Sequence, residues 1–247
     1  MTDTSITLVL FVLFIFFSAF QQTLTGFGFA LFAMPIATFL VGLQTAAPLV
    51  ALVAITLYTV NFFRYKSAIN VREVFRLGIA AAVGVPIGIW AFANVSETII
   101  KWLLGLVLIG YAIYSLAKPA TLNLRVERWV YVAGFLAGCL GGAYNTPGPP
   151  VVIYGSLREW DKDEFRAVLQ AIFLLTASLS VASHLIAQHV TTTVLTFYVV
   201  SAPALLLGVW AGARIDSRVD KNLFRTIVAL MVFIVGVSMM IDGLSRG

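Results

Sequence analysis

Apolar runs follow one another along almost the whole 247-residue chain, and only short charged loops separate them. A soluble domain carries roughly 25% charged residues, whereas this chain is 60% hydrophobic and 11% charged. The runs are 6–24, 28–43, 46–63, 77–93, 99–117, 129–144, 149–157, 167–187, 194–212 and 226–244. Since a helix needs about 20 apolar residues to cross a bilayer, we predict an all-α polytopic membrane protein with a single membrane domain, 1–247.

Four loops hold nearly all of the positive charge: 64–76, 118–128, 158–166 and 214–225. Only Lys101 and Arg246, of the 16 basic residues, lie elsewhere. Because basic residues in short loops stay on the cytoplasmic side, we expect all four loops on the cytoplasmic face of an inner membrane. The segment 129–157 must then start and end on the cytoplasmic side. It is too short for two full crossings, which need about 40 residues. It is predicted to be a re-entrant helical hairpin that turns near 145–150.

Two polar breaks interrupt the apolar sequence, at 24–29 and at 144–150. They lie 120 positions apart, so that Gly28 matches Gly148. Broken backbone at membrane depth is tolerated only where protein covers it or where it lines a cavity. A matched pair of breaks in two halves of a chain is typical of a transporter binding site.

The same offset relates other parts of the sequence. Gly88 and Trp90 match Gly208 and Trp210, and no gap is needed. The basic loop 64–76, however, corresponds to 184–196, which contains no Lys or Arg. Equivalent positions should therefore lie on opposite sides, as in an inverted-topology repeat. We predict repeats at about 5–118 and 125–244, each a broken or re-entrant hairpin plus three transmembrane helices, with both termini outside. Whether 6–43 is re-entrant or crosses fully stays open.

The second arm of each hairpin would begin at its break, with free N–H groups near the midplane. Such helix ends attract anions. The candidate substrate-binding residues at the breaks are Gln21, Gln22, Thr25, Gly26, Gly28, Tyr144, Asn145, Thr146 and Gly148. In the alternative interpretation, the glycines are kinks or packing contacts, and the polar side chains bond neighbouring helices.

Three further candidates lie in the run 167–187: Gln170, Thr176 and His184. Thr176 and His184 share a helix face and could line the pathway, although threonines in membrane helices often bond their own backbone. Asn61 and Arg64 could form the cytoplasmic mouth. Arg64 could equally be a positive-inside anchor.

Enzymatic chemistry finds little support in the composition. Two histidines and one cysteine leave no nucleophile–base set and no metal cluster, so we expect no catalytic residue, metal or cofactor. No Asp or Glu lies in the middle of a run, which argues against a carboxylate proton relay. The expected partners are the lipid bilayer and a small anion. We expect no binding to nucleic acid, and the chain could form a homodimer.

Four stretches resemble the TauE/SafE sulfite exporter family: 25–30 followed by Pro35, 134–142, 148–154 and 157–166. The resemblance covers nearly the whole chain and implies export of sulfite, sulfoacetate or a related small organosulfur anion. The inside-negative potential favours anion exit by about 2.3 kcal/mol per charge at 100 mV, so export needs no proton relay. The alternatives are a transporter of another small anion or metabolite, a channel-like anion pore, and a non-transporting membrane subunit.

Overall fold

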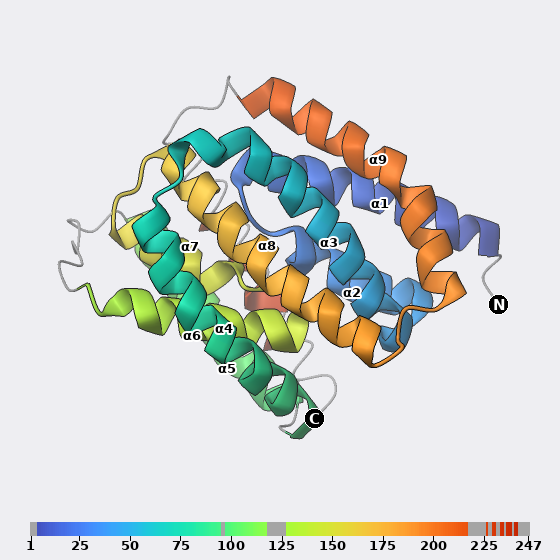
Figure 1. Cartoon of the computed structure of the whole chain (residues 1–247), viewed down its shortest axis with the longest axis horizontal. Helices are drawn as coiled ribbons and strands as arrows, with labels where there is room; N and C mark the ends of the chain where they lie inside the picture. The colour runs from blue at the N-terminus through green and yellow to red at the C-terminus, as the bar shows by residue number, and fades with distance from the viewer. Residues whose placement is uncertain are drawn as a thin grey trace.

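The computed structural model describes residues 4–94, 97–117, 127–216 and single residues between 226 and 241 (Figure 1). The described chain forms helices α1 (Thr4–Thr25), α2 (Phe29–Val41), α3 (Leu43–Tyr65), η1 (Lys66–Ala68), α4 (Val71–Asn94), α5 (Glu97–Ala117), α6 (Trp129–Tyr144), α7 (Gly148–Leu157), α8 (Lys162–Ile186) and α9 (Thr192–Asp216). Within this described part, α1, α3, α4, α8 and α9 are long and apolar enough to cross a membrane. The prediction of an all-α polytopic membrane protein is confirmed. The predicted run 226–244 is described only at scattered positions between 226 and 241.

Three helices beside the breaks are too short to cross. At 1.5 Å per residue, the 16 residues of α6 and the 10 residues of α7 span about 24 and 15 Å, against a hydrocarbon core of about 30 Å. The 13 residues of α2 span about 20 Å. α2, which is shorter than the predicted run 28–43, is therefore too short to cross the core by itself. The 22-residue α1 is long enough to do so.

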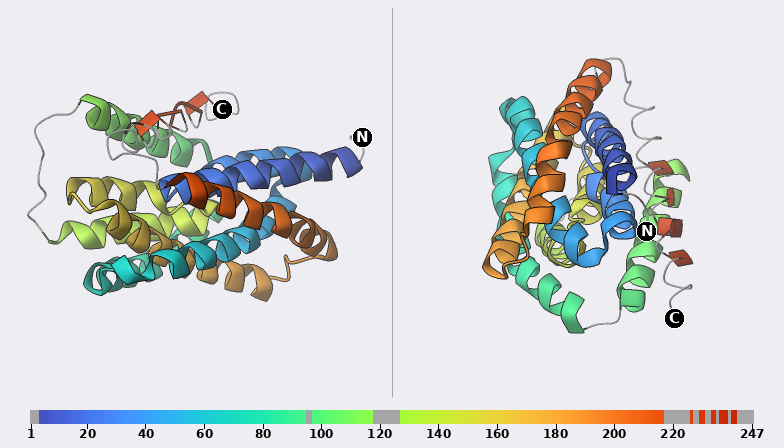
Figure 2. Two further views of the ribbon diagram at one scale, coloured as in Figure 1. Left: turned by 90° about the horizontal axis from the view of Figure 1, so that it is seen from above. Right: turned by 90° about the vertical axis from the view of Figure 1, so that its right-hand side faces the viewer.

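The helices pack in closely approached pairs. α1 lies beside α9, α4 lies beside α6, and α3 lies against α8 in the middle of the molecule (Figures 1 and 2). Glycines permit this approach, since a Cβ on Gly88 of α4 would lie 2.0 Å from the carbonyl oxygen of Cys139 in α6. A Cβ on Gly208 of α9 would lie 2.4 Å from the carbonyl oxygen of Phe16 in α1. Small residues at helix contacts are typical of membrane bundles.

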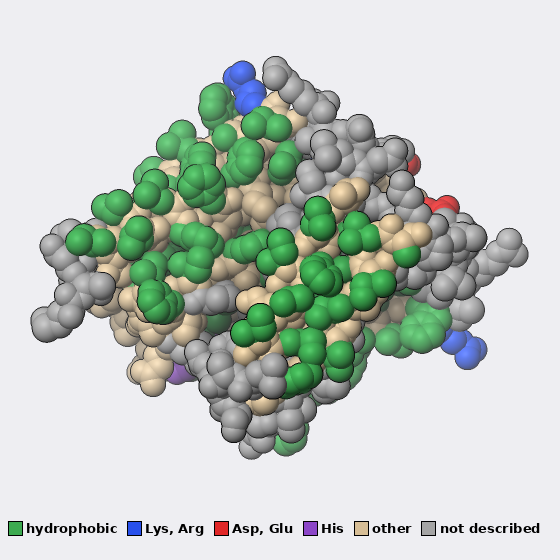
Figure 3. Space-filling model, turned by 180° about the vertical axis from the view of Figure 1, so that it is seen from behind, with side chains coloured by type: hydrophobic (Ala, Val, Ile, Leu, Met, Phe, Trp, Pro, Cys, Tyr) green, Lys and Arg blue, Asp and Glu red, His purple; other side chains and the backbone are tan. Residues whose placement is uncertain are grey.

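The surface of the bundle is apolar over broad areas. Figure 3 shows hydrophobic side chains across the face that it displays, with charged side chains at the edges. Large side chains such as Phe39 and Ile186 are 89% and 84% exposed, as expected where lipid covers the protein. Phe27 and Phe29, beside the first break, are instead fully buried, so the breaks lie in the core.

Two loops are shorter than predicted, and the predicted extents 64–76 and 158–166 were wrong. α4 already begins at Val71 and α8 at Lys162. Asn70 caps α4, because its Oδ1 accepts a hydrogen bond from the amide of Glu73 (3.2 Å), an arrangement that stabilises a helix start. Hydropathy marks the end of the apolar run, whereas a capped helix continues into its charged turns.

Candidate functional site

The first break separates α1 from α2 and is held by a glutamine. Gly26 and Gly28 have φ of 87° and 103°, which only glycine adopts readily. The amide of Gln22 spans the break: its Nε2 donates to the oxygen of Gly26 (3.0 Å), and its Oε1 accepts from the amide of Phe29 (2.9 Å). Two backbone groups released by the interruption, the oxygen of Gly26 and the amide of Phe29, are thereby satisfied from within the chain.

Other predicted residues also bond the backbone of this break. Gln21 Nε2 donates to the oxygen of Phe27 (2.8 Å) and to the hydroxyl of Thr25 (2.7 Å). Gln170 of α8 donates from Nε2 to the oxygen of Gly26 (2.8 Å). These side chains therefore position the first break, and the structure gives each of them a partner in the protein.

Arg166 of α8 lies beneath the same break and is fully buried. Its Nη2 donates to the carbonyl oxygen of Leu24, at the C-terminal end of α1, where the helix dipole favours a cation. Its Nη1 donates to the hydroxyl of Tyr65 (3.4 Å), and Cζ lies 5.4 Å from the centroid of that ring. A Cβ on Gly26 would meet Cγ of Arg166 at 3.0 Å. Arg166 thus joins α1, α3 and α8.

The second break separates α6 from α7. Asn145 ends α6 with φ of 56°, and its amide donates back to the oxygen of Gly141 (2.9 Å), which is the αL cap of a helix C-terminus. Asn145 Nδ2 also donates to the oxygen of Ala47 in α3 (3.4 Å). Thr146 is 3% exposed, and its hydroxyl has no hydrogen-bond partner within the part of the chain that the structure describes.

The two breaks border one small cavity of about 10 Å³. Its walls are formed by Gly28, Ala30, Leu31, Tyr58, Asn145, Thr146, Pro147, Gly148 and Phe173, none of which is charged. A cavity needs roughly 10–15 Å³ of such space to hold one water molecule, so an anion larger than water enters only where these walls move apart. A Cβ on Gly148 would lie 3.4 Å from Phe173 and 3.7 Å from Phe27, which places the second break directly against the first.

The structure therefore gathers four predicted residues around one cavity, namely Gly28, Asn145, Thr146 and Gly148. Sequence reasoning missed the aromatic wall. The rings of Tyr58 and Phe173 lie 5.2 Å apart between centroids. Neither residue differs in the sequence from the many other aromatic residues of the apolar runs, so no local signal pointed to them.

The remaining candidates do not line this cavity. Thr176 bonds the oxygen of Ile172 in its own helix (3.0 Å), and His184 lies 3.3 Å from His189, between their Nδ1 atoms, at the end of α8. Asn61 is buried and donates to Thr23 (3.3 Å), whereas Arg64 is exposed and donates to the oxygen of Ala213 (3.1 Å). The side chain of Tyr144 lies outside the described residues.

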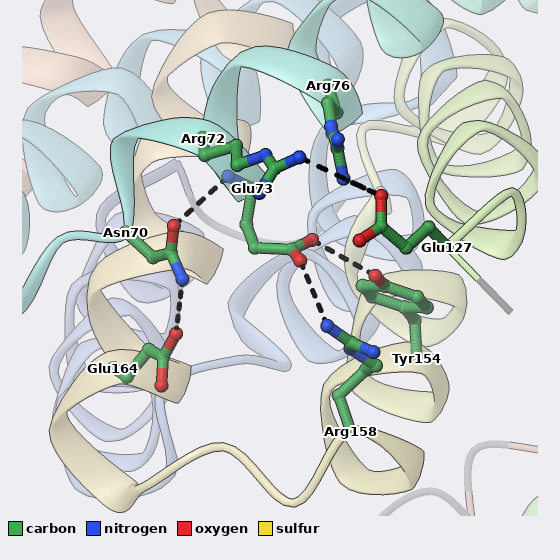
Figure 4. A network of polar contacts seen from close by, with 8 residues as sticks. All are labelled: Asn70, Arg72, Glu73, Arg76, Glu127, Tyr154, Arg158 and Glu164. Carbon is green, nitrogen blue, oxygen red and sulfur yellow. Dashed lines mark hydrogen bonds and ion pairs between the residues drawn. The ribbon is translucent and has the colours of Figure 1, made fainter. Parts of the chain in front are cut away.

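A polar network joins α4 to α7 and α8 at the ends of these helices (Figure 4). Glu73 is only 6% exposed. Its carboxylate accepts a hydrogen bond from the hydroxyl of Tyr154 (3.0 Å) and pairs with Arg158 (3.5 Å). Asn70 donates to Glu164 of α8 (2.9 Å). The arm α7, whose first residue Gly148 lines the cavity, is thus attached to α4 at its far end.

Comparison with known proteins gives a consistent assignment. The family model described as "Sulfite exporter TauE/SafE" matches residues 11–239. The chain is 23% identical over 230 residues to the "Probable sulfite/organosulfonate exporter TauE" of Cupriavidus necator, covering 91% of this chain and 90% of that protein. It is 26% identical over 179 residues to the "Probable inner membrane transporter protein TsaS" of Comamonas testosteroni, covering 69% and 74%.

No solved structure matches the chain. The family model nevertheless spans most of its length, and the described helices include five that can cross a membrane. The chain belongs to the TauE/SafE sulfite exporter family of membrane transporters.

Proposed function

We propose that the protein is a secondary transporter that exports a small sulfur-containing anion, such as sulfite, sulfoacetate or another organosulfonate, through the inner membrane. The family supports this function, as does the relative named a sulfite/organosulfonate exporter. A second relative is named as an inner membrane transporter.

The cavity between the two breaks carries the proposal. It brings the starts of α2 and α7 against one small space, and helix N-termini offer N–H donors and a positive dipole end to an anion. Asn145 and Thr146 add neutral polar groups to its wall. We assign Gly28, Thr146 and Gly148 to substrate contact, and Gln21, Gln22, Thr25, Gly26 and Gln170 to holding the first break in place.

Export follows from the charge of the cargo. The membrane potential drives an anion outward by about 2.3 kcal/mol per charge at 100 mV, which corresponds to roughly 50-fold for a single charge. The residues that line the cavity include no carboxylate, so the proposed mechanism uses the potential and no proton relay.

We further propose that the two halves, about 5–118 and 125–244, are inverted-topology repeats within one membrane domain. At an offset of 120 residues, α1 corresponds to α6, α3 to α8, and α4 to α9. The packing repeats accordingly: α1 packs on α9 as α6 packs on α4, and α3 packs on α9 as α8 packs on α4. In this arrangement the basic loops are cytoplasmic and both termini are outside, which puts Arg64 at the cytoplasmic mouth.

Flux measurements in proteoliposomes with a clamped potential test the function. Labelled sulfite, sulfoacetate, sulfate and taurine are offered one at a time, and both net uptake and counterflow are recorded. We expect saturable, potential-sensitive movement of at least one sulfur anion, with counterflow. Flux without saturation or counterflow would indicate a pore instead.

The same glycine-to-leucine change at two positions tests whether the flux depends on the cavity. Gly148→Leu places a side chain toward Phe27 and Phe173 and should abolish transport. Gly110 of α5 is exposed and a Cβ there meets nothing within 4 Å, so Gly110→Leu should leave transport unchanged. Absence of movement of every anion, in folded protein, would discard the proposed cargo.

A further inference from the structure

Two observations at the cavity concern the charge of its ligand. The first is the opening turn of α2, a 13-residue helix whose residues Gly28, Ala30 and Leu31 line the cavity. The amide of Phe29 is bound by Gln22, and the first bond of helical type is donated by the amide of Phe32 to Gly28 (3.3 Å). The amides of Ala30 and Leu31 precede that bond, and such amides lack partners inside a helix.

The second observation is the hydroxyl of Thr146. It is buried in the wall formed by the second break, and among the described residues no group accepts from it or donates to it. A buried hydroxyl without a partner is unfavourable, and an anionic oxygen in the cavity would supply one. The start of α7 contributes less, because Pro149 and Pro150 have no N–H.

The donors in the cavity wall are all neutral. The residues that line it include no Lys, Arg or His, and the nearby guanidinium of Arg166 is bonded to Leu24 and Tyr65. A helix N-terminus is equivalent to roughly half of a positive charge. Such a site can compensate much of one negative charge, whereas a second charge would remain buried without a counter-ion.

We propose that the cavity selects singly charged oxyanions, namely hydrogensulfite and monovalent sulfonates, over doubly charged ones such as sulfite and sulfate. The anion is held by the amides of Ala30 and Leu31 from one repeat and by the hydroxyl of Thr146 from the other. The inference rests on the proposed function and deepens it, because it disfavours sulfoacetate, which carries a second charge, relative to sulfonates without a carboxylate.

The pH dependence of two substrates tests the selectivity. Hydrogensulfite loses its proton near neutral pH, whereas methanesulfonate stays singly charged. At fixed total concentration and fixed potential, we expect initial sulfite flux to fall in proportion to the remaining hydrogensulfite as the pH rises from mildly acid to mildly alkaline. Methanesulfonate flux, measured in the same liposomes, should be constant and controls for pH effects on the protein.

The flux measurements distinguish a wrong charge selectivity from a wrong transport function. Sulfite flux that is constant or increases with pH, beside constant methanesulfonate flux, would overturn the selectivity and leave transport established. Counterflow of sulfate as fast as that of methanesulfonate would do the same. Absence of flux for every anion would overturn the proposed function and this inference with it.

Thr146 can be tested without changing its shape. Thr146→Val replaces only the hydroxyl with a methyl group, and a hydrogen bond to a charged group corresponds to about a tenfold to hundredfold change in affinity. We expect the half-saturating methanesulfonate concentration to rise by about that factor, while Thr146→Ser stays within about threefold of the parent.

The melting temperature in detergent separates this role from a structural one. Without ligand, Thr146→Val should melt no lower than the parent protein, because its hydroxyl has no partner among the described residues. Added methanesulfonate should raise the melting temperature of the parent and of Thr146→Ser more than that of Thr146→Val. Equal stabilisation of all three proteins, with equal half-saturation, would overturn the assignment of Thr146.

Discussion

Arg166 is a buried cation that connects three helices through its guanidinium group. Arg166→Met keeps an apolar stem beside Gly26 but removes the donor to Leu24. A buried acceptor that loses its donor destabilises a fold by about 1–3 kcal/mol. We therefore expect Arg166→Met to lower the melting temperature of the detergent-solubilised protein and to reduce flux.

Arg72 provides the matched control for this change. Its side chain is 72% exposed and lies 3.9 Å from Glu127, and surface ion pairs contribute about 0–1 kcal/mol. Arg72→Met should therefore leave the melting temperature close to that of the parent. Equal losses in the two variants would contradict a special role for Arg166.

Gly28 combines an unusual backbone conformation with a close neighbour. Its φ is 103°, and an added Cβ would lie 3.0 Å from Nε2 of Gln21. Gly42 has φ of 77° but no atom within 4 Å of such a Cβ. Strained conformations cost about 1–3 kcal/mol, so both Gly28→Ala and Gly42→Ala should lower the melting temperature.

Only Gly28→Ala should also impair transport, because Gln21 must move and Gln21 holds the first break. Both variants carry the backbone strain of alanine at positive φ. Comparing the substrate concentrations at which they reach half-maximal flux therefore isolates the effect on the cavity. Unchanged half-saturation in Gly28→Ala, or an equal loss in Gly42→Ala, would show that the break does not set the geometry of the site.

At the scale of the helices, the arm α7 has two ends with different tasks. Gly148 lines the cavity, while Tyr154 and Arg158 bind Glu73 of α4. A hydrogen bond to a charged group contributes about 1.5–3 kcal/mol, so Tyr154→Phe should lower the melting temperature and, by loosening α7, the flux. Tyr131→Phe, at an exposed residue of α6, is the control and should change neither.

A double-mutant cycle shows whether the tyrosine acts through Glu73. If it does, Tyr154→Phe combined with Glu73→Gln should lower the melting temperature by less than the sum of the single changes, as expected for residues in contact. Strictly additive effects would show that Tyr154 stabilises α7 by other means.

The helix breaks could be predicted from the sequence because their chemistry is local. Gly26 and Gly28, which have positive φ, and the proline-rich start of α7 lie at the interruptions themselves. The start of α8 could not be predicted in the same way, since hydropathy assigned Arg166 to a loop. Its partner Leu24 lies 142 positions earlier, so its burial depends on a tertiary contact that no local pattern contains.

The lining of the cavity was predictable to the same extent. Gly28, Asn145, Thr146 and Gly148 could be named from the sequence because they lie in the breaks themselves. Tyr58 and Phe173 belong to regular helices and reach the cavity only through the packing of α3 against α8. The buried pairing of Glu73 with Tyr154 was missed because its two residues lie 81 positions apart.

At the scale of the whole molecule, the recurrence of helix pairs at one offset is the strongest support for a repeat. The contact of α1 with α2 in the first half corresponds to that of α6 with α7 in the second. The repeat exchanges α3 and α8, which pack against each other. A pseudo-two-fold relation in the membrane plane would place the two breaks at a common centre, where the cavity lies. Charge separates the halves, since the loop around Ser67 is basic and the loop around Ala187 contains no Lys or Arg.

Ser67 and Ala187 provide a direct test of the inversion, because they are equivalent at the offset of 120 and both are exposed. In a Cys139→Ser background, each is replaced singly by cysteine and treated in intact cells with a membrane-impermeant maleimide. The positive-inside rule puts Ser67 in the cytoplasm, so Ala187→Cys should be labelled from outside, and Ser67→Cys only after permeabilisation. Labelling of both from the same side would exclude inverted topology, since equivalent positions of inverted repeats lie on opposite sides.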